Sequence, residues 1–197
     1  QPHGQELVDT LRMAMADALN AYQEHNGTLP TLVLVYRDGV GRSQLERLRT
    51  VEIAGIRAAF GDFADYHPPL AVIVVHKRVN RRLFELTGDG TWVNPRPGVT
   101  CPGIATELSC PSFYLVSQAT RTGSALPTHY VVAENTTPLT QEDLERATFQ
   151  LAHLYFNWAG TIKTPAPVAY AHRVALLCGQ AKIQEIPPSW RKTYYFL

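Results

Sequence analysis

The chain has 197 residues, of which 45% are hydrophobic and 18% are charged. This composition fits one folded domain with a buried core and excludes an intrinsically disordered chain. The formal net charge is only +1, so bulk charge gives no support for nucleic-acid binding. No apolar run approaches the roughly 20 residues that span a bilayer, so we expect no membrane partner.

The chain begins with an amphipathic segment and an apolar run. Apolar residues recur at steps of three and four between Glu6 and Tyr22, which predicts a helix that ends at Asn26-Gly27. The nearly continuous apolar segment Thr31–Tyr36 predicts a strand buried on both faces. The residues Arg37–Gly41 are then expected to form a loop.

A second helix and strand follow. Ser43–Phe60 is a predicted helix that begins with a capping box between Ser43 and Glu46. Its expected inward side chains are Leu45, Leu48, Val51 and Ile56. Leu70–Val75 is a second buried strand, so the segment as a whole predicts a parallel βαβ unit and an α/β fold.

The rest of the chain combines loops, short strands and two helices. The Gly, Pro and Thr content of residues 87–110 predicts a loop with short edge strands. A polar loop joins the predicted strands Phe113–Ser117 and His129–Ala133. The remaining elements are a helix capped by Thr140 that runs to about Phe156, and a last helix from Tyr170 to about Gly179, with Pro165 and Pro167 before it.

Three residues are candidates for catalysis or metal binding. Asp38 follows a predicted strand at the edge where open α/β sheets bind ligands, although an Asp before Gly is also common in turns. Glu6, near the start of the first helix, is also favoured there by the helix dipole alone. His172 lies among apolar residues, where a histidine is more often packed than ligating. Spacing alone leaves the role of all three open.

A cluster of cations follows the second predicted strand. Parallel pairing would place Lys77, Arg78, Arg81 and Arg82 at the same sheet edge as Asp38. Cations hold phosphates and a carboxylate holds a divalent metal ion, so this combination suits a polyanionic substrate. The alternative is an ordinary solvated run of charges.

Seven sequence strings, in order, carry a family resemblance. They are YRDGV at 36–40, VVHKRVN at 74–80, NPRPG at 94–98, FYLVSQ at 113–118, PTHY at 127–130, LAHLYFNW at 151–158 and PAPVAYAH at 165–172. Through them the chain resembles the PIWI domain of Argonaute and Piwi proteins over nearly its whole length. The HKRVN string, the Asn157-Trp158 pair and the Tyr-Tyr-Phe-Leu ending are more similar to the Piwi branch.

The resemblance implies a ribonuclease H-like α/β fold and an acidic tetrad. Residues 1–197 would form a partial PIWI domain that lacks its first strands. Asp38 and His172 match two members of the tetrad, and Glu6 resembles the family's mobile glutamate. The fourth member is expected upstream of Gln1, together with MID, PAZ and N modules. Asp38 and His172 are the expected ligands of Mg²⁺ or Mn²⁺.

The resemblance also implies contacts with nucleic acid. The expected guide-binding groups are Lys77, Arg78, Arg81, Arg82, Gln118, Arg121, Thr122 and the terminal carboxylate of Leu197. The implied partners are a small guide RNA and a complementary target RNA, held by a monomer. The implied activity is Mg²⁺-dependent cleavage of the target RNA in gene silencing.

Other functions stay open at this stage. The protein can be a guide-binding silencing protein that recruits partners without cutting, an inactive structural fragment, or an unrelated metal-dependent phosphotransfer enzyme. The three cysteines lack zinc-site spacing and favour a reducing compartment, so we expect the cytoplasm, with the nucleus as the alternative.

Overall fold

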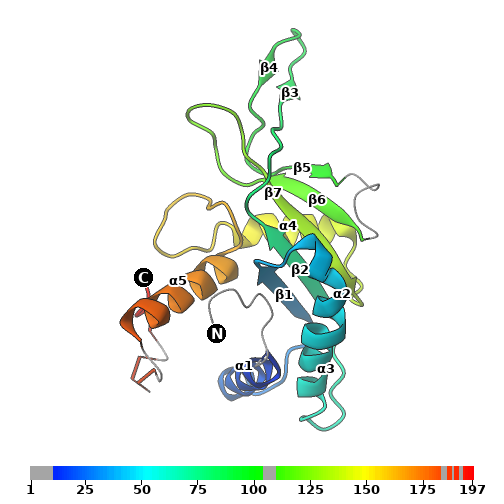
Figure 1. Cartoon of the computed structure of the whole chain (residues 1–197), viewed down its shortest axis with the longest axis vertical. Helices are drawn as coiled ribbons and strands as arrows, with labels where there is room; N and C mark the ends of the chain where they lie inside the picture. Colours follow the sequence, from blue (N-terminus) through cyan, green and yellow to red (C-terminus); the bar gives the residue numbers. More distant parts are fainter. Residues whose placement is uncertain (1–10, 104–109, 183–185, 188, 191–192) are drawn as a thin grey trace. The chain divides into compact units, whose positions relative to one another are not determined.

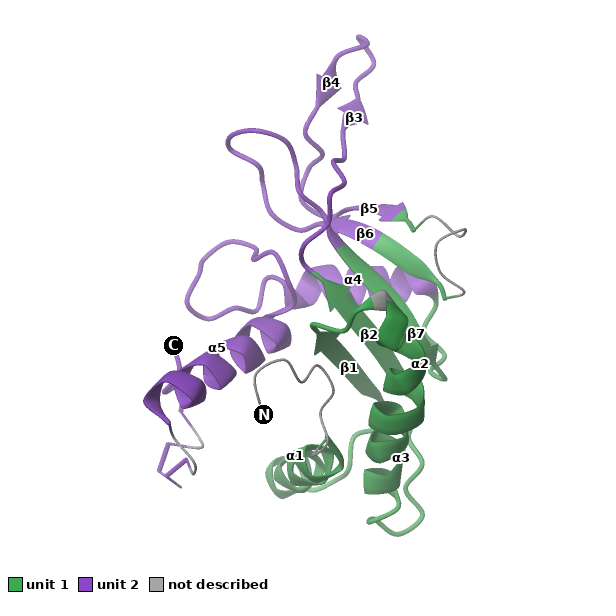
Figure 2. Cartoon of the chain, viewed as in Figure 1, with its two compact units in different colours: residues 1–76, 102–113, 129–140 green, residues 77–101, 114–128, 141–197 purple. Residues whose placement is uncertain are grey.

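The computed structural model describes residues 11–103, 110–182, 186–187, 189–190 and 193–197. They fall into two compact units, shown in Figure 2. Unit 1 comprises residues 1–76, 102–113 and 129–140, and unit 2 comprises residues 77–101, 114–128 and 141–197. The strand order of the larger sheet is β1-β2-β7-β6-β5 (Figure 1). Helices and this sheet confirm the predicted α/β class.

In unit 1, β1 (Val33–Asp38) and β2 (Leu70–His76) form the parallel pair that the sequence predicts. β2 is buried along nearly its whole length, whereas β1 is half-buried at every position. The prediction that the first strand is buried on both faces is therefore wrong. β1 lies at the edge of the sheet formed by the described residues, so its side chains have strand neighbours on one side.

The strand β7 (Thr128–Asn135) pairs antiparallel with β2, and β6 covers Ser112–Val116. Both strands agree with the predicted segments to within two residues. A register shift between Val72 and Ile73 interrupts the β2–β7 ladder. The strands β2, β6 and β7 carry much of the buried apolar surface.

Helix α1 (Leu11–Asn26) packs its apolar stripe against the core of unit 1. Leu19 is buried, and Leu11 and Met15 contact the core cluster, as the periodicity predicts. The helix ends at Asn26, as the Asn26-Gly27 pair predicts, and the Gly27 N–H donates to the Gln23 carbonyl at 2.8 Å. Glu6 and the rest of the predicted first turn lie outside the described residues.

The helical segment between β1 and β2 contains an irregular turn. It begins as the 3₁₀ turn η1 (Arg42–Gln44), continues as α2 (Leu45–Arg47) and the π-helical η2 (Leu48–Ile53), and ends as α3 (Ala54–Phe60). The predicted capping box is wrong. The N-cap position of α2 is occupied by Gln44, and no side chain forms a capping hydrogen bond there.

The inward side chains of this segment differ in part from the prediction. Val51 and Glu52 both lie within the π-helical turn, which contains one residue more than an α-helical turn. Val51, predicted to face inward, is 43% exposed, whereas Glu52 is only 1% exposed. The predictions for Leu45, Leu48 and Ile56 are confirmed, since all three are buried.

Unit 2 contains short strands and two helices. β3 (Glu85–Leu86) and β4 (Trp92–Val93) form an antiparallel hairpin, and β5 covers Val99–Pro102. These strands confirm the expectation of a loop-rich segment with short strands; residues 104–109 lie outside the described part. The helices are α4 (Gln141–Leu151) and α5 (Ala166–Ala181).

Both helices of unit 2 differ from their predicted limits. α4 ends at Leu151 rather than near Phe156, because the next N–H groups bond three residues back and tighten the chain into a turn. α5 begins at Ala166, before the predicted Tyr170. Pro165 caps it and Pro167 lies in its first turn, where the missing N–H costs no helical bond. None of the described helices combines the length and the apolar character needed to cross a bilayer.

Candidate functional site

Asp38 is the last residue of β1, so the structure places it within the strand rather than in the loop predicted after it. Its partner across the parallel ladder is Val75, near the end of β2. The carboxyl ends of the two strands therefore coincide, which is the arrangement that places ligand-binding residues in open α/β sheets. The residue is half-buried, which leaves part of its surface accessible to a ligand.

The residues before and after Asp38 fix its backbone. Arg37 Nε and Nη2 donate to the two carboxylate oxygens of Glu52, at 2.8 and 2.9 Å, and Arg37 Nη1 donates to the Asp38 carbonyl. Gly39 follows with φ +78°, a conformation that glycine adopts most readily. Val40 is buried, and its carbonyl lies 2.8 Å from His76 Nε2 on β2. Asp38 is thus held from both directions along the chain.

Glu52 is a positioning residue that the sequence reasoning missed. It lies on the π-helical turn and its side chain is 1% exposed, while that of Arg37 is 15% exposed. Two features of the sequence could have predicted this ion pair. Glu52 lies four residues after Leu48, a position that would face the core of a regular helix, and Arg37 lies beside Asp38. A buried acid requires a cationic partner, and Arg37 supplies it.

His172 lies on α5, in unit 2, and is exposed. The packed alternative for this histidine is therefore wrong in the described structure. Asp38 belongs to unit 1, so their joint role as metal ligands stays a prediction, as does that of Glu6, which lies outside the described residues. Within the described ranges, no three His, Cys, Asp or Glu residues are grouped so that they could hold a metal ion.

The predicted cation cluster lies in unit 2. Arg78 and Arg82 are exposed, and Lys77 and Arg81 are half-buried. The Arg81 guanidinium lies 5.4 Å from the ring centroid of Tyr114, within the range of a cation–π contact.

Lys163 joins this cluster and was also missed. Its Nζ donates to the Lys77 carbonyl at 3.0 Å. Partial burial lowers the pKa of Lys163, and the positive charges of Arg82 and Lys77 lower it further. These three cations therefore share one region of positive potential, which favours an anion. The only sequence signal was a lysine just before the string PAPVAYAH.

The main chain at Lys163 is held as firmly as its side chain. The Lys163 carbonyl accepts hydrogen bonds from Ser117 Oγ and Thr128 Oγ1, each at 3.0 Å. Ser117 directly follows β6, and Thr128 begins β7. The ends of two strands thus fix the loop that carries this lysine.

The other predicted nucleic-acid contacts also lie in unit 2. Gln118 Nε2 donates to the Thr161 carbonyl at 3.0 Å, and Arg121 and Thr122 are exposed. Leu197 is half-buried, and its N–H donates to the Tyr194 carbonyl at 3.1 Å. Their roles in binding nucleic acid stay predictions.

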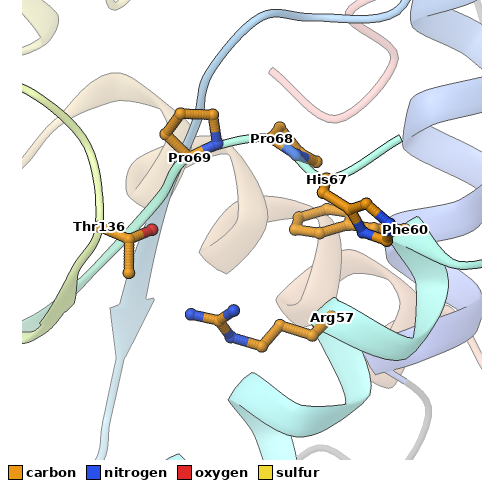
Figure 3. Close-up of a pocket in the computed structure, with 6 residues that line it drawn as sticks. All are labelled: Arg57, Phe60, His67, Pro68, Pro69 and Thr136. Carbon is orange, nitrogen blue, oxygen red and sulfur yellow. The ribbon is translucent and has the colours of Figure 1, made fainter. Parts of the chain in front are cut away.

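A separate open pocket lies in unit 1. Its volume is about 310 Å³, and Figure 3 shows Arg57, Phe60, His67, Pro68, Pro69 and Thr136 around it. The prolines directly precede β2, whereas Asp38 pairs near the opposite end of that strand. The pocket contains none of the predicted site residues.

Comparison with known proteins identifies the family. The sequence profile of the Piwi domain matches residues 1–182. The chain belongs to the Piwi domain family. The Piwi-like protein Ago3 of Bombyx mori is 41% identical over 181 residues, which cover 91% of this chain and 19% of that protein. The crystal structure of Drosophila Piwi superposes with a TM-score of 0.84 at 35% identity, over 98% of this chain and 27% of that chain.

The structure of Kluyveromyces polysporus Argonaute with a guide RNA shares the fold at a TM-score of 0.80. It is 21% identical and covers 98% of this Piwi-domain chain and 26% of its own chain. The higher identities to Piwi-like proteins confirm the closer resemblance to the Piwi branch. The superposition on Drosophila Piwi confirms the ribonuclease H-like fold. The chain spans about a fifth of the length of the curated relatives it matches.

Proposed function

We propose that the protein to which this chain belongs binds a small guide RNA and uses it to cleave complementary target RNA in gene silencing. The observation that carries the proposal is the cluster of Lys77, Arg82 and Lys163 in a chain of the Piwi domain family. Base pairing, rather than protein contacts, would select the target, as in other RNA-guided systems.

The cation cluster fits a phosphate backbone. Lys163 is held by three hydrogen bonds, so its ammonium is already placed before a phosphate arrives. Burial, and after it the positive charges of Arg82 and Lys77, lower the pKa of Lys163, and an incoming phosphate would offset those positive charges. The guide-binding part of the proposal therefore explains why cations are kept close together at this point.

The cleavage part depends on Asp38. A carboxylate at the carboxyl end of a strand, with its backbone fixed by Arg37 and Gly39, suits Mg²⁺ or Mn²⁺, which prefer oxygen ligands. We infer that Asp38 would hold the metal and that His172 would ligate it or orient water. When bound, the divalent ions supply activation of water and stabilisation of the leaving 3′ oxygen.

The test uses the full-length protein, loaded with a guide RNA of defined sequence. Asp38→Asn should abolish cleavage of a labelled complementary RNA and leave guide binding unchanged. Asp62→Asn is the matched control, because Asp62 is an exposed acid of the same unit that pairs with Arg12. Cleavage of the target by Asp38→Asn at the wild-type rate would refute the proposed role of Asp38 in cleavage. Guide binding by a wild-type protein that never cuts would leave target recognition and partner recruitment as its function.

A further inference from the structure

The β3–β4 hairpin of unit 2 presents apolar side chains to solvent. Trp92 is 66% exposed, Leu86 is 55% exposed, and Phe84, directly before β3, is 50% exposed. Leu86 and Trp92 are direct partners in the antiparallel register, so both project from one face of the hairpin. Exposed aromatic and apolar residues that gather on one element usually mark an interaction surface.

The hairpin is structured at its tip. The Thr87 N–H donates to the Thr91 carbonyl at 2.9 Å, and Thr87 Oγ1 donates to the same oxygen at 2.8 Å. Thr87 and Thr91 also donate to the Asp89 carboxylate, which lowers the pKa of Asp89. These bonds fix the turn, so Trp92 is displayed on a defined two-stranded element rather than on a loose loop.

The base of the hairpin is joined to the loop at 117–127. Asn94 Nδ2 donates to the Gly123 carbonyl, and the Ala125 N–H donates to Asn94 Oδ1, both at 2.8 Å. Leu83 forms a β-bridge with Ala125. The exposed Arg121 is carried by this same loop, so the hairpin and a second cationic segment share one support.

The charge of this region selects the kind of partner. Residues 77–101 contain five lysines or arginines and two acids, a formal charge of +3 in a chain whose total is +1. Of the two acids, Glu85 pairs with Val93 in the register, so it projects from the face opposite Trp92. Exposed aromatic side chains on the same segment as several cations are a combination that proteins use to bind single-stranded nucleic acid.

We propose that Trp92 is a stacking platform for an unpaired base of the guide or target strand, with Leu86 supporting it and the cations of residues 77–82 holding the adjacent phosphates. The proposal rests on the RNA-guided function proposed above and adds a site to it. Stacking is tolerant of sequence, since every base has a π-face. The site would therefore add affinity without selecting particular targets.

The first test measures RNA affinity of the full-length protein with three variants. Trp92→Leu keeps an apolar side chain and removes the aromatic ring, whereas Trp92→Phe keeps a ring. Trp92→Leu should weaken binding of the guide or of a target to the guide-loaded protein by about 5- to 100-fold, and Trp92→Phe by much less. Trp158→Leu, which removes another exposed tryptophan of the same unit, should change neither affinity.

The salt dependence of binding separates stacking from charge. Loss of a stacked base leaves the number of ionic contacts unchanged, so Trp92→Leu should lower the affinity without changing its slope against salt concentration. The proposal would be overturned if Trp92→Leu bound both the guide and the target with the same affinities as the wild-type protein. If Lys163→Met still weakens guide binding in that case, the proposed function stands and only the stacking site is wrong.

The second test needs no variant and is independent of folding defects. Guide and target RNAs carrying 5-iodouridine at single positions are bound to the wild-type protein and irradiated, and crosslinked peptides are identified by mass spectrometry. A crosslink to Trp92 from one strand would support the proposal and identify that strand. The absence of a crosslink to the hairpin at every position of both strands would contradict it.

Discussion

Replacement of Glu52 by glutamine should weaken the structure around Asp38 more than any change to a surface ion pair. Glutamine keeps the shape of the side chain and removes its charge, so the Arg37 guanidinium loses its anionic partner. Removal of one partner from a buried ion pair costs about 3 to 5 kcal/mol. Glu52 is 1% exposed and Arg37 is 15% exposed, and Arg37 retains its bond to the Asp38 carbonyl. The expected loss therefore lies at the lower end, about 3 kcal/mol.

Hydrogen exchange followed by mass spectrometry measures this loss locally in the full-length protein. Amides of residues 33–38 and 48–53 should exchange about 100-fold faster in Glu52→Gln, because each 1.4 kcal/mol is roughly tenfold in the opening equilibrium. The control is Asp62→Asn, since the side chains of Arg12 and Asp62 are 57% and 42% exposed and such pairs contribute about 0 to 1 kcal/mol. The double variant Arg37→Met with Glu52→Leu should recover most of the protection. If Glu52→Gln exchanges no faster than Asp62→Asn, the assigned role of the buried pair is wrong.

Three further predictions concern unit 2. Lys163→Met should weaken guide binding and reduce the slope of log affinity against log salt concentration by about 0.7, as expected for the loss of one phosphate contact of a single strand. Lys163→Arg should preserve both the affinity and the slope. An unchanged slope in Lys163→Met would argue against a contact between Lys163 and a guide phosphate. A bound phosphate should raise the lowered pKa of Lys163, so guide binding takes up a proton. The affinity for the guide should therefore fall as the pH rises toward the ordinary lysine value of 10.5. The same dependence of affinity on pH in Lys163→Arg would contradict this. Gly98→Ala should lower the free energy of unfolding by about 1 to 3 kcal/mol, because a Cβ there would lie 3.0 Å from the Phe149 ring, at a φ of +96°. Faster hydrogen exchange of residues 141–151 would measure this loss. Gly88→Ala is the control, because a Cβ at Gly88 meets open space.

The elements that depend on local sequence were predictable. The apolar run of β2 and the periodicity of the segment before it indicate the βαβ unit, because crossover geometry allows few arrangements. The half-buried state of β1 was not predictable in the same way. It depends on which strands pair beside it, and hydrophobicity along one segment does not contain that information.

The site was predictable where it follows the strand ends and family strings, and not where it depends on distant contacts. Asp38 could be selected from its position after an apolar run. The hydrogen bond from Lys163 to the Lys77 carbonyl joins residues 86 positions apart, so no local sequence pattern predicts it. Glu52 lies four residues after Leu48, where a helical period does point inward, but a charged residue is not expected in the core without a partner, and its partner Arg37 lies 15 positions away.

The π-helical turn also sets how this segment tolerates changes in length. Deletion of one exposed residue within η2 (Leu48–Ile53), such as Val51, would convert the turn to a regular α-helix, because a π turn holds one residue more than an α-helical turn in about the same rotation. Leu45 and Leu48 before the deletion, and Ile53 and Ile56 after it, would keep facing the core in which all four are buried. Insertions and deletions are usually excluded from helices because they disturb one face. Here the turn already accommodates an extra residue, so the segment can lose one residue without turning half of its core face outward.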